Sequence, residues 1–251
     1  MVKASLYPIL FPPIQDPLVS LFQNGAYKGF LFDNIGQQAF QNIGMTEPCT
    51  TDGQSCAALK DRSGSVNNAT QATTASQPTF KAGSPDYLSF DGSNDLASTF
   101  VASGSATIAF RAKIPAPTAS GQCVLGAYND PTAGVYLGLW TDGTIAGDWA
   151  TGAWSLRTSV SLVDQDVIAI LRGEQARQEL WVAGELAASA SNANANNLSA
   201  PLYIGSLNNT NNPDIDSPLV GLVYRAFAIN RYVTDAEVQT ITNALGAGII
   251  P

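Results

Sequence analysis

The sequence predicts an all-β protein: a two-sheet antiparallel β-sandwich with an extended N-terminal arm and one short C-terminal helix. The composition is the first observation, because 13% charged and 45% hydrophobic residues in 251 exclude a disordered chain. The second is abundant Gly, Ala, Ser, Thr and Asn, which favours short strands and turns. The third is a series of roughly ten to twelve short apolar segments separated by turn signals, which is typical of a sandwich.

Residues 1–27 are predicted to form the extended arm. Prolines at positions 8, 12 and 13 interrupt its apolar run, and no small-residue cleavage site follows, so the run does not resemble a signal peptide. The apolar side chains need a surface to cover them, either on their own domain or on a neighbouring protein. The candidate assembly residues are Leu6, Tyr7, Ile9, Leu10, Phe11 and Ile14.

Residues 28–83 are expected to be an irregular lead-in that wraps the sandwich and forms no separate domain. Turn signals occur at Asp33-Asn34, Asp52-Gly53 and 61–64. The polar run 67–77 lacks the apolar residues needed to build a core. The sandwich and its helix are therefore assigned to residues 84–251.

A strand, a tight turn and a second strand open the sandwich between Tyr87 and Val101. Leu88 and Phe90 share one face of the first strand, and Asp91-Gly92 supplies the turn. Apolar patterning predicts the later strands, most of them by period-two alternation. They are expected at 108–114, 135–139, 154–162, 167–171, 178–182, 185–188, 202–204 and 219–229, with a two-residue hairpin turn at Ala183-Gly184.

The last predicted element is an amphipathic helix that begins after Thr234. Thr234 and Glu237 have the spacing of a capping box. Val238, Ile241 and Leu245 then share one face, which we expect to cover the sandwich.

Charge and the lack of histidine exclude several functions. Twelve Lys and Arg against 20 Asp and Glu give a net charge of −8, which is unsuited to binding a phosphate backbone. The sequence contains no run of about 18 apolar residues that would predict a membrane span. Without histidine, the Ser-His-Asp and Cys-His catalytic groups and the usual zinc sites are not available. We expect no nucleic-acid partner and no membrane partner.

The three cysteines leave two arrangements open. Cys49 and Cys56 are close enough in sequence to bridge across the turn between them, whereas Cys123 has no evident partner. An odd number is typical of free thiols in a reducing cytoplasm, which is the favoured interpretation. A Cys49–Cys56 disulfide is the alternative.

Four segments carry a family resemblance: Tyr87–Asp95, Glu179–Gly184, Leu202–Gly205 and Arg225–Glu237. In their order and spacing over about residues 84–247 they resemble the laminin-G-like jelly roll of the concanavalin A-like lectin/glucanase superfamily. Some relatives on this fold are glycoside hydrolases, which need two carboxylates on one strand. This chain has no Glu-x-Asp-x-Glu strand, so we expect no enzymatic activity.

The lead-in carries a second resemblance, in 51–54, 61–64 and 67–73. These residues resemble the segment that precedes such domains in virion proteins of tailed bacteriophages. The resemblance implies a structural virion protein, a decoration, fibre or adaptor component, assembled in the host cytoplasm. It would be a homo-oligomer that joins other virion proteins through its arm. The alternative function is a carbohydrate-binding module that attaches to cell-surface glycans.

Glycan binding requires exposed aromatic rings beside polar groups. Tyr128, Tyr136, Trp140 and Trp149 fall within one stretch and form the candidate glycan site. Trp149, set among glycines, is the tryptophan least constrained to point inward. For each tryptophan, core packing or a subunit contact is the favoured interpretation, and glycan stacking is the alternative.

Calcium is the one cofactor that the resemblance brings into consideration, because laminin-G-like domains often carry it at the rim of the sandwich. Hard cations bind oxygen ligands, and Asp91, Asn94 and Asp95 form the candidate cluster. The favoured interpretation is that these residues occur there because turns prefer them.

Overall fold

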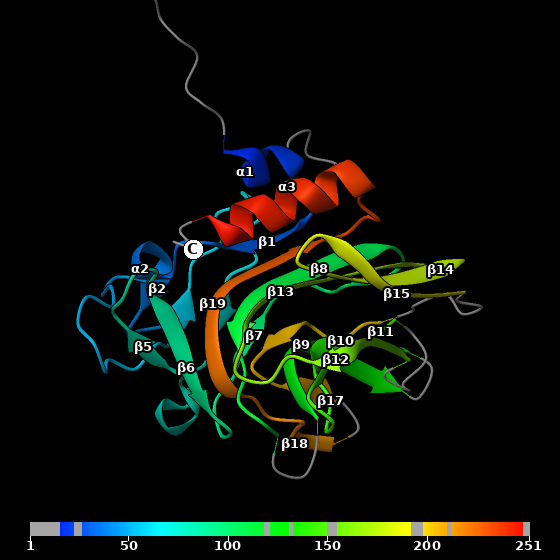
Figure 1. The fold of residues 1–251 in the computed structure, drawn as a ribbon. Coiled ribbons are helices and arrows are strands. Elements are labelled where there is room, and N and C mark those ends of the chain that lie inside the picture. Colours follow the sequence, from blue (N-terminus) through cyan, green and yellow to red (C-terminus); the bar gives the residue numbers. More distant parts are fainter. Residues whose placement is uncertain are drawn as a thin grey trace, which may run out of the picture.

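The protein is described by a computed structural model that covers residues 16–22, 27–117, 121–130, 133–149, 155–191, 198–209 and 212–247. Two mainly antiparallel sheets face each other, which confirms the predicted two-sheet β-sandwich. Helices α1 (Pro17–Leu21) and α3 (Asp235–Gly246) lie side by side on the outer face of one sheet (Figure 1).

The sheet beneath the helices has eight strands in this described part of the chain. Their order is β15, β14, β13, β8, β19, β6 and β5, and β1 pairs with the half of β19 that β6 leaves free. The strands are β1 (Gly29–Phe32), β5 (Thr79–Lys81), β6 (Tyr87–Asp91), β8 (Ala106–Lys113), β13 (Asp166–Glu174), β14 (Arg177–Val182), β15 (Glu185–Ser191) and β19 (Val220–Ile229).

The second sheet has eleven strands over the same ranges, in the order β12, β11, β10, β9, β16, β7, β4, β3 and β2. The hairpin of β17 and β18 joins it through β9. The strands are β2 (Ala39–Phe40), β3 (Ala58–Leu59), β4 (Ala69–Thr70), β7 (Leu96–Ser98), β9 (Gln122–Asp130), β10 (Ala133–Leu139), β11 (Thr144–Trp149), β12 (Leu156–Ser161), β16 (Tyr203–Ile204), β17 (Leu207–Asn209) and β18 (Asn212–Asp216). Two short helices, α2 (Ile35–Gln38) and the 3₁₀ helix η1 (Thr74–Ser76), lie in the connections.

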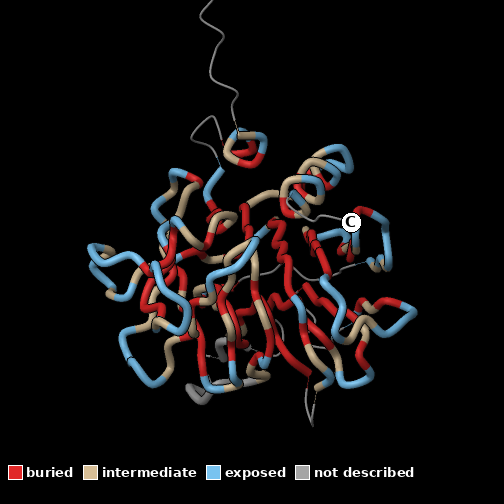
Figure 2. Tube along the Cα trace, turned by 60° about the vertical axis from the view of Figure 1, so that its left-hand side comes forward, coloured by how far each residue is buried: buried red, intermediate tan, exposed pale blue. Residues whose placement is uncertain are grey.

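The main core fills the space between the sheets. Ile108, Phe110 and Ala112 on β8 are fully buried in it, on the face that the alternation predicts. Figure 2 shows that buried positions follow the strands while exposed positions gather in the loops at the rim. The hairpin at Ala183-Gly184 is also as predicted, with both residues at positive φ, 50° and 85°.

The lead-in is more regular than the sequence analysis expects. It contributes β1 and β5 to one sheet and β2, β3 and β4 to the other. At Gly29 a Cβ atom would lie 1.9 Å from the carbonyl oxygen of Ala228, so only glycine lets β1 approach β19 this closely. Strand β1 is buried at all four positions and β2 to β4 have two residues each, so none of them shows period two.

The extended arm is wrong as a prediction for residues 17–21, which form α1. Asp16 caps this helix by accepting a 2.9 Å hydrogen bond from the backbone N–H of Leu18, and Pro17 suits the first helical position. Leu18, Leu21 and Phe22 are buried against α3 and β19 of the same chain. The candidate assembly residues Leu6, Tyr7, Ile9, Leu10, Phe11 and Ile14 lie outside the described residues.

Helix α3 is the predicted C-terminal helix, and its capping box is present. Thr234 Oγ1 accepts a hydrogen bond from the N–H of Glu237, and Glu237 Oε2 accepts one from the N–H of Thr234 at 2.8 Å. Val238, Ile241 and Leu245 are fully buried on the sheet, as expected for a covering helix.

Candidate functional site

Two of the predicted glycan-site aromatics are inside the protein. Trp149 is 0% exposed and packs between the sheets, where Gly173 makes room for its indole ring. Tyr136 is 2% exposed, and its hydroxyl donates a 2.9 Å hydrogen bond to the buried Asp148. Residues 144–149 form β11, in which Ile145 and Trp149 share the inner face, so Trp149 has the favoured core position and the glycan-site assignment of this residue is wrong.

The other two aromatics are half-buried. One face of Trp140 is covered by the guanidinium of Arg157, 4.4 Å from the ring centroid, and Gly121 lies against its benzo ring. Tyr128 packs over Gly134, where a Cβ atom would approach the ring to 2.8 Å. The four aromatic side chains do not form one open stacking surface.

The candidate calcium ligands direct their oxygens at donors of the protein itself, Asp91 and Asn94 within the turn and Asp95 outside it. Asp91 Oδ1 accepts hydrogen bonds from the N–H and hydroxyl of Ser93, at 2.9 and 2.7 Å. Asn94 Oδ1 accepts from the N–H of Asp91 at 2.9 Å, and Asp95 accepts from Gln71 and Ser206. For Asp91 and Asn94 these bonds are the turn-forming role that the sequence favours over a metal site. Asp95 instead is buried and bonds to residues outside the turn.

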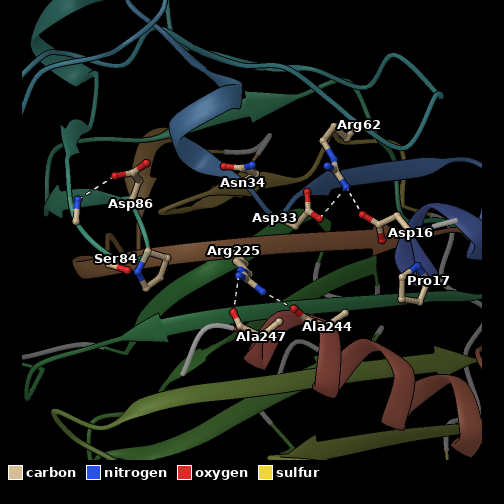
Figure 3. Close-up of a pocket in the computed structure, with 12 residues that line it drawn as sticks. Asp16, Pro17, Asp33, Asn34, Arg62, Ser84, Asp86, Arg225, Ala244 and Ala247 are labelled. Carbon is tan, nitrogen blue, oxygen red and sulfur yellow. Dashed lines mark hydrogen bonds and ion pairs between the residues drawn. The ribbon is translucent and has the colours of Figure 1, made fainter. Parts of the chain in front are cut away.

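A different group of side chains converges beside the helices, in a pocket of about 670 Å³ (Figure 3). It lies between Asp16 at the start of α1, the β1–α2 connection, the loop before β6 and the end of α3. The volume falls within the range of about 300–1,000 Å³ that small-molecule sites occupy. The residues that line it are Asp16, Pro17, Asp33, Asn34, Arg62, Gly83, Ser84, Pro85, Asp86, Arg225, Ala244 and Ala247.

Arg62 holds two carboxylates on one side of the pocket. Its Nη2 donates to Asp33 Oδ2 at 3.0 Å and also to Asp16 Oδ2. Burial raises the pKa of Asp33 above its ordinary value, the charge of Arg62 opposes this rise, and the negative charge of Asp16 adds to it. Asp33 is thus a desolvated carboxyl group at the wall of a cavity.

Arg225 forms the opposite wall together with the end of α3 (Figure 3). Its guanidinium donates to the carbonyl oxygens of Ala244, Leu245 and Ala247, the last two at 3.0 and 2.7 Å. The carbonyl of Ala244 also accepts the N–H of the C-cap residue Ala247, and the last carbonyls of a helix lack partners in a following turn, so Arg225 completes the C-terminus of α3. Burial, with the nearby charge of Arg111, lowers the pKa of Arg225.

Asp86 is set in place by its own loop and by α2. Its Oδ1 accepts a 2.9 Å hydrogen bond from the N–H of Gly83. At Gly36 a Cβ atom would lie 1.9 Å from Asp86 Oδ2, so this glycine is what allows the carboxylate to rest against α2.

Three polar atoms of the pocket-lining residues are buried and have no hydrogen-bond partner among the described residues: Asp33 Oδ1, Arg62 Nε and Arg225 Nε. One is an acceptor and two are donors. Buried polar groups are nearly always paired, so unpaired groups at one cavity indicate where water or a ligand completes the structure.

A pair of half-buried tyrosines lies next to this pocket on the outer face of the sheet. The rings of Tyr87 and Tyr224 meet edge to face, with centroids 5.4 Å apart. The Tyr87 ring also lies against Gly83, a lining residue. The polar cavity therefore has aromatic surface beside it.

This pocket is not predicted from the sequence, because the residues that line it come from distant segments of the chain. Asp33-Asn34 and the segment 61–64 appear in the sequence only as turn signals, and Arg225 appears only within a segment of family resemblance. The one available signal is charge in apolar surroundings, since Arg225 interrupts a long apolar run.

Within the described ranges, no three His, Cys, Asp or Glu side chains are grouped as metal ligands. No helix in those ranges is long and apolar enough to cross a membrane.

No protein-family model matches the chain, and no curated protein matches its sequence. Solved structures match its fold at low identity. The binding domain of Paraclostridial Mosquitocidal Protein 1 is 14% identical with a TM-score of 0.56, over 75% of this chain and 50% of that one. This chain thus spans half the length of that structure.

Two further matches come from glycan-processing proteins. Domain 4 of AbnA, an arabinanase of Geobacillus stearothermophilus solved with arabinotriose, is 17% identical with a TM-score of 0.57, over 76% of this chain and 99% of that domain. A sialidase of Trypanosoma rangeli is 15% identical with a TM-score of 0.55, over 83% of this chain and 36% of that one. At these identities the matches show the fold alone, which is a two-sheet β-sandwich.

Proposed function

We propose that this chain is a non-enzymatic carbohydrate-binding β-sandwich and that its ligand occupies the pocket formed by Asp33, Arg62, Asp86 and Arg225. The observation that carries the proposal is the set of buried atoms without partners: Asp33 Oδ1, Arg62 Nε and Arg225 Nε. A sugar presents hydroxyl groups that both donate and accept hydrogen bonds, so one ligand class matches all three once the buried side chains turn toward the cavity.

The charges of the pocket favour a neutral sugar. Three carboxylates, Asp16, Asp33 and Asp86, face two arginines. Arg62 is already paired with two of the carboxylates, and Arg225 with carbonyl oxygens of α3. An anionic ligand would meet uncompensated negative charge, whereas hydroxyl groups would not.

The arrangement of the carboxylates supports binding over catalysis. A glycosidase needs two carboxyl groups on either side of the scissile bond, one to protonate the leaving group. Here Asp16 and Asp33 both contact the same guanidinium of Arg62, which holds them side by side. The arabinotriose complex of AbnA domain 4 adds that a domain of this fold accommodates a neutral oligosaccharide.

The test is a glycan array probed with the full-length chain, printed with arabino-oligosaccharides, bacterial surface glycans and sialyllactose. Asp33→Asn and Asn34→Ala each remove or weaken a polar group of the pocket, and we expect binding about tenfold weaker. Trp140→Ala is the matched control, because it alters the aromatic site predicted from sequence and leaves the pocket intact. Loss of binding in Trp140→Ala alone contradicts the pocket, and no binding to any glycan rejects the function.

A virion role is the second proposal, and it rests on the sequence resemblance of the lead-in and on the apolar residues of the arm. The comparisons do not support it, and the arm residues lie outside the described residues. Because α1 packs on its own sandwich, the segment to remove is 2–15, which leaves Asp16 to Phe22 in place. Truncated protein that still joins virus particles as well as the full chain contradicts this role.

A further inference from the structure

Cys49 and Cys56 lie at the two ends of a surface turn, and their thiols meet beneath it. Both side chains are buried, 1% and 0% exposed, whereas Thr50 to Gly53 and Ser55 between them are exposed. The Cys49 thiol donates to the carbonyl oxygen of Ser55, the residue before Cys56, at 3.7 Å, and the Cys56 thiol donates to that of Ala58 at 3.3 Å. Both are free thiols in this structure.

The backbone holds the two cysteines against one scaffold. The N–H of Cys49 donates to the carbonyl of Ala39 at 2.9 Å, and the N–H of Cys56 donates to that of Pro78 at 2.8 Å. The turn between them is tied to β5, since Gly53 N–H donates to the carbonyl of Phe80 and Phe80 N–H donates back to Gln54. Because these bonds hold both backbones, a bond between the sulfurs has to form mainly by rotation of the two side chains away from their carbonyl acceptors.

We propose that Cys49 and Cys56 form a reversible intramolecular disulfide, and that the structure described here is its reduced, dithiol form. The oxidant is a low-molecular-weight disulfide such as oxidised glutathione. The Cys49 thiolate attacks one glutathione sulfur and releases one glutathione thiolate. Cys56 then loses its proton, attacks Cys49 Sγ and releases the second. Two protein thiols and one glutathione disulfide become one protein disulfide and two glutathione thiols, with two electrons transferred.

The electrostatics assign the first attack to Cys49. The neighbouring Cys56 thiol lowers the pKa of the Cys49 thiol, while the proximity of Cys49 and burial raise the pKa of Cys56 well above its ordinary value. Cys49 is also the residue next to the exposed turn, so a local opening of residues 50–53 admits the oxidant. Cys123 lies elsewhere, buried in β9 beside Gly126 and Leu207.

The disulfide would fix part of the lead-in, and the redox state of the compartment decides whether it forms. In a reducing cytoplasm the thiols stay free, and in an oxidising medium the bond fixes the turn against β5. Closing this turn restricts the unfolded chain, so the oxidised form should be the more stable one.

The experiment equilibrates the full-length chain in glutathione buffers of increasing oxidised fraction, then quenches with acid, alkylates under denaturing conditions and maps peptides by mass spectrometry. We expect one disulfide, Cys49 to Cys56, with Cys123 alkylated. The equilibrium constant for forming this disulfide should be about a hundredfold larger in the native chain than in denaturant. The oxidised form should also unfold at a higher temperature than the reduced form.

The matched variants are Cys49→Ser and Cys56→Ser, which should form no internal disulfide, and Cys123→Ser, which should behave like the wild type. The same buffers are also used to refold the chain from denaturant. In the unfolded chain all thiols are accessible to glutathione, so slow access to a buried thiol does not affect the final equilibrium. Three alkylated cysteines in the most oxidising buffer overturn the proposal. So does a glutathione adduct as the end product, or a bond that involves Cys123.

Discussion

Tyr136 on β10 and Asp148 on β11 face each other across the second sheet, and the tyrosine hydroxyl donates a 2.9 Å hydrogen bond to Asp148 Oδ2. The carboxylate is 0% exposed and also accepts bonds from Ser155 and the N–H of Trp149. A buried charge of this kind depends on each of its donors. The pair therefore stabilises the fold, and its burial removes Tyr136 from any glycan-stacking surface.

Tyr136→Phe should lower the free energy of unfolding by about 1–3 kcal/mol, because it removes one of the hydrogen bonds to a buried carboxylate. Urea unfolding at neutral pH measures the change. Tyr128→Phe is the matched control: it removes a hydroxyl from a half-buried tyrosine on the neighbouring strand β9, and a smaller change is expected. Equal losses in the two variants would contradict the special role of the Asp148 contact.

Gly36→Ala tests the contact between α2 and Asp86 that shapes one wall of the pocket. The added Cβ would lie 1.9 Å from Asp86 Oδ2, so the carboxylate must leave and lose its bond to the N–H of Gly83. We expect a net loss of about 1 kcal/mol in the wild-type background, although alanine is by itself the better helix former.

In an Asp86→Ala background the same substitution should have the opposite sign. The clash is then absent, and the helix preference of alanine should stabilise the protein by about 0.5 kcal/mol. A double-mutant cycle of urea unfolding measures this coupling. Additive effects of the two substitutions would show that the carboxylate does not depend on Gly36.

Alternation along the sequence predicts the elements that have one buried and one open face. The hairpin of β14 and β15 and helix α3 follow their expected patterns. Strand β8 alternates as predicted on its inner face, but it is buried on both faces from Ala106 to Ala112 because the helices cover its outer face. Alternation does not predict β1, which is buried on every side. It also does not predict the two-residue strands β2 to β4, which are too short to show a period.

The candidate site is less predictable than the fold because it depends on distant contacts. Asp33, Asp86 and Arg225 are unremarkable where they occur in the sequence, and only the pairing of β1 and β6 with β19 brings them together. The glycan-site assignment of Trp149 is wrong for a different reason. Its glycine-rich neighbours indicate a loop, whereas Gly173 leaves room in the core for the indole ring.

Glu237→Gln tests the charge of the α3 capping box. The ion pair with Arg231 lowers the pKa of Glu237 from 4.5 to about 2, with burial opposing and the bonds to Thr234 assisting. Because the folded-state value is depressed, this carboxylate contributes stability that is fully present above about pH 4.5 and is lost as the pH falls through about 2.

We therefore expect Glu237→Gln to be less stable than the wild type by about 1 kcal/mol at pH 7, and equally stable near pH 2, because glutamine keeps the cap but not the ion pair. Thermal unfolding across this pH range measures the difference. Glu185→Gln, at an exposed glutamate on β15, is the control and should show no such trend. A constant difference at every pH would contradict the ionic contribution.

Deletions at the N-terminus distinguish the arm from the helix that follows it. Removing 2–22 takes away Leu18, Leu21 and Phe22, which are buried against α3 and Phe227, and exposes that apolar surface. We expect a loss of about 2–4 kcal/mol in unfolding free energy, after allowance for the entropy of ordering the segment. Removing 2–15 keeps these contacts, so its denaturation curve should match that of the full chain.

Leu18→Ala in the full chain is the point variant that checks the cause. It should lower the unfolding free energy by about 2–3 kcal/mol, because it leaves a cavity between α1 and α3. Val19→Ala, at a half-buried position, should lower the unfolding free energy by less than about 1 kcal/mol. If the 2–22 deletion is as stable as the 2–15 deletion, α1 is not part of the folded sandwich. The boundary between arm and domain would then lie near residue 27, as the proline pattern predicts, and not at Asp16.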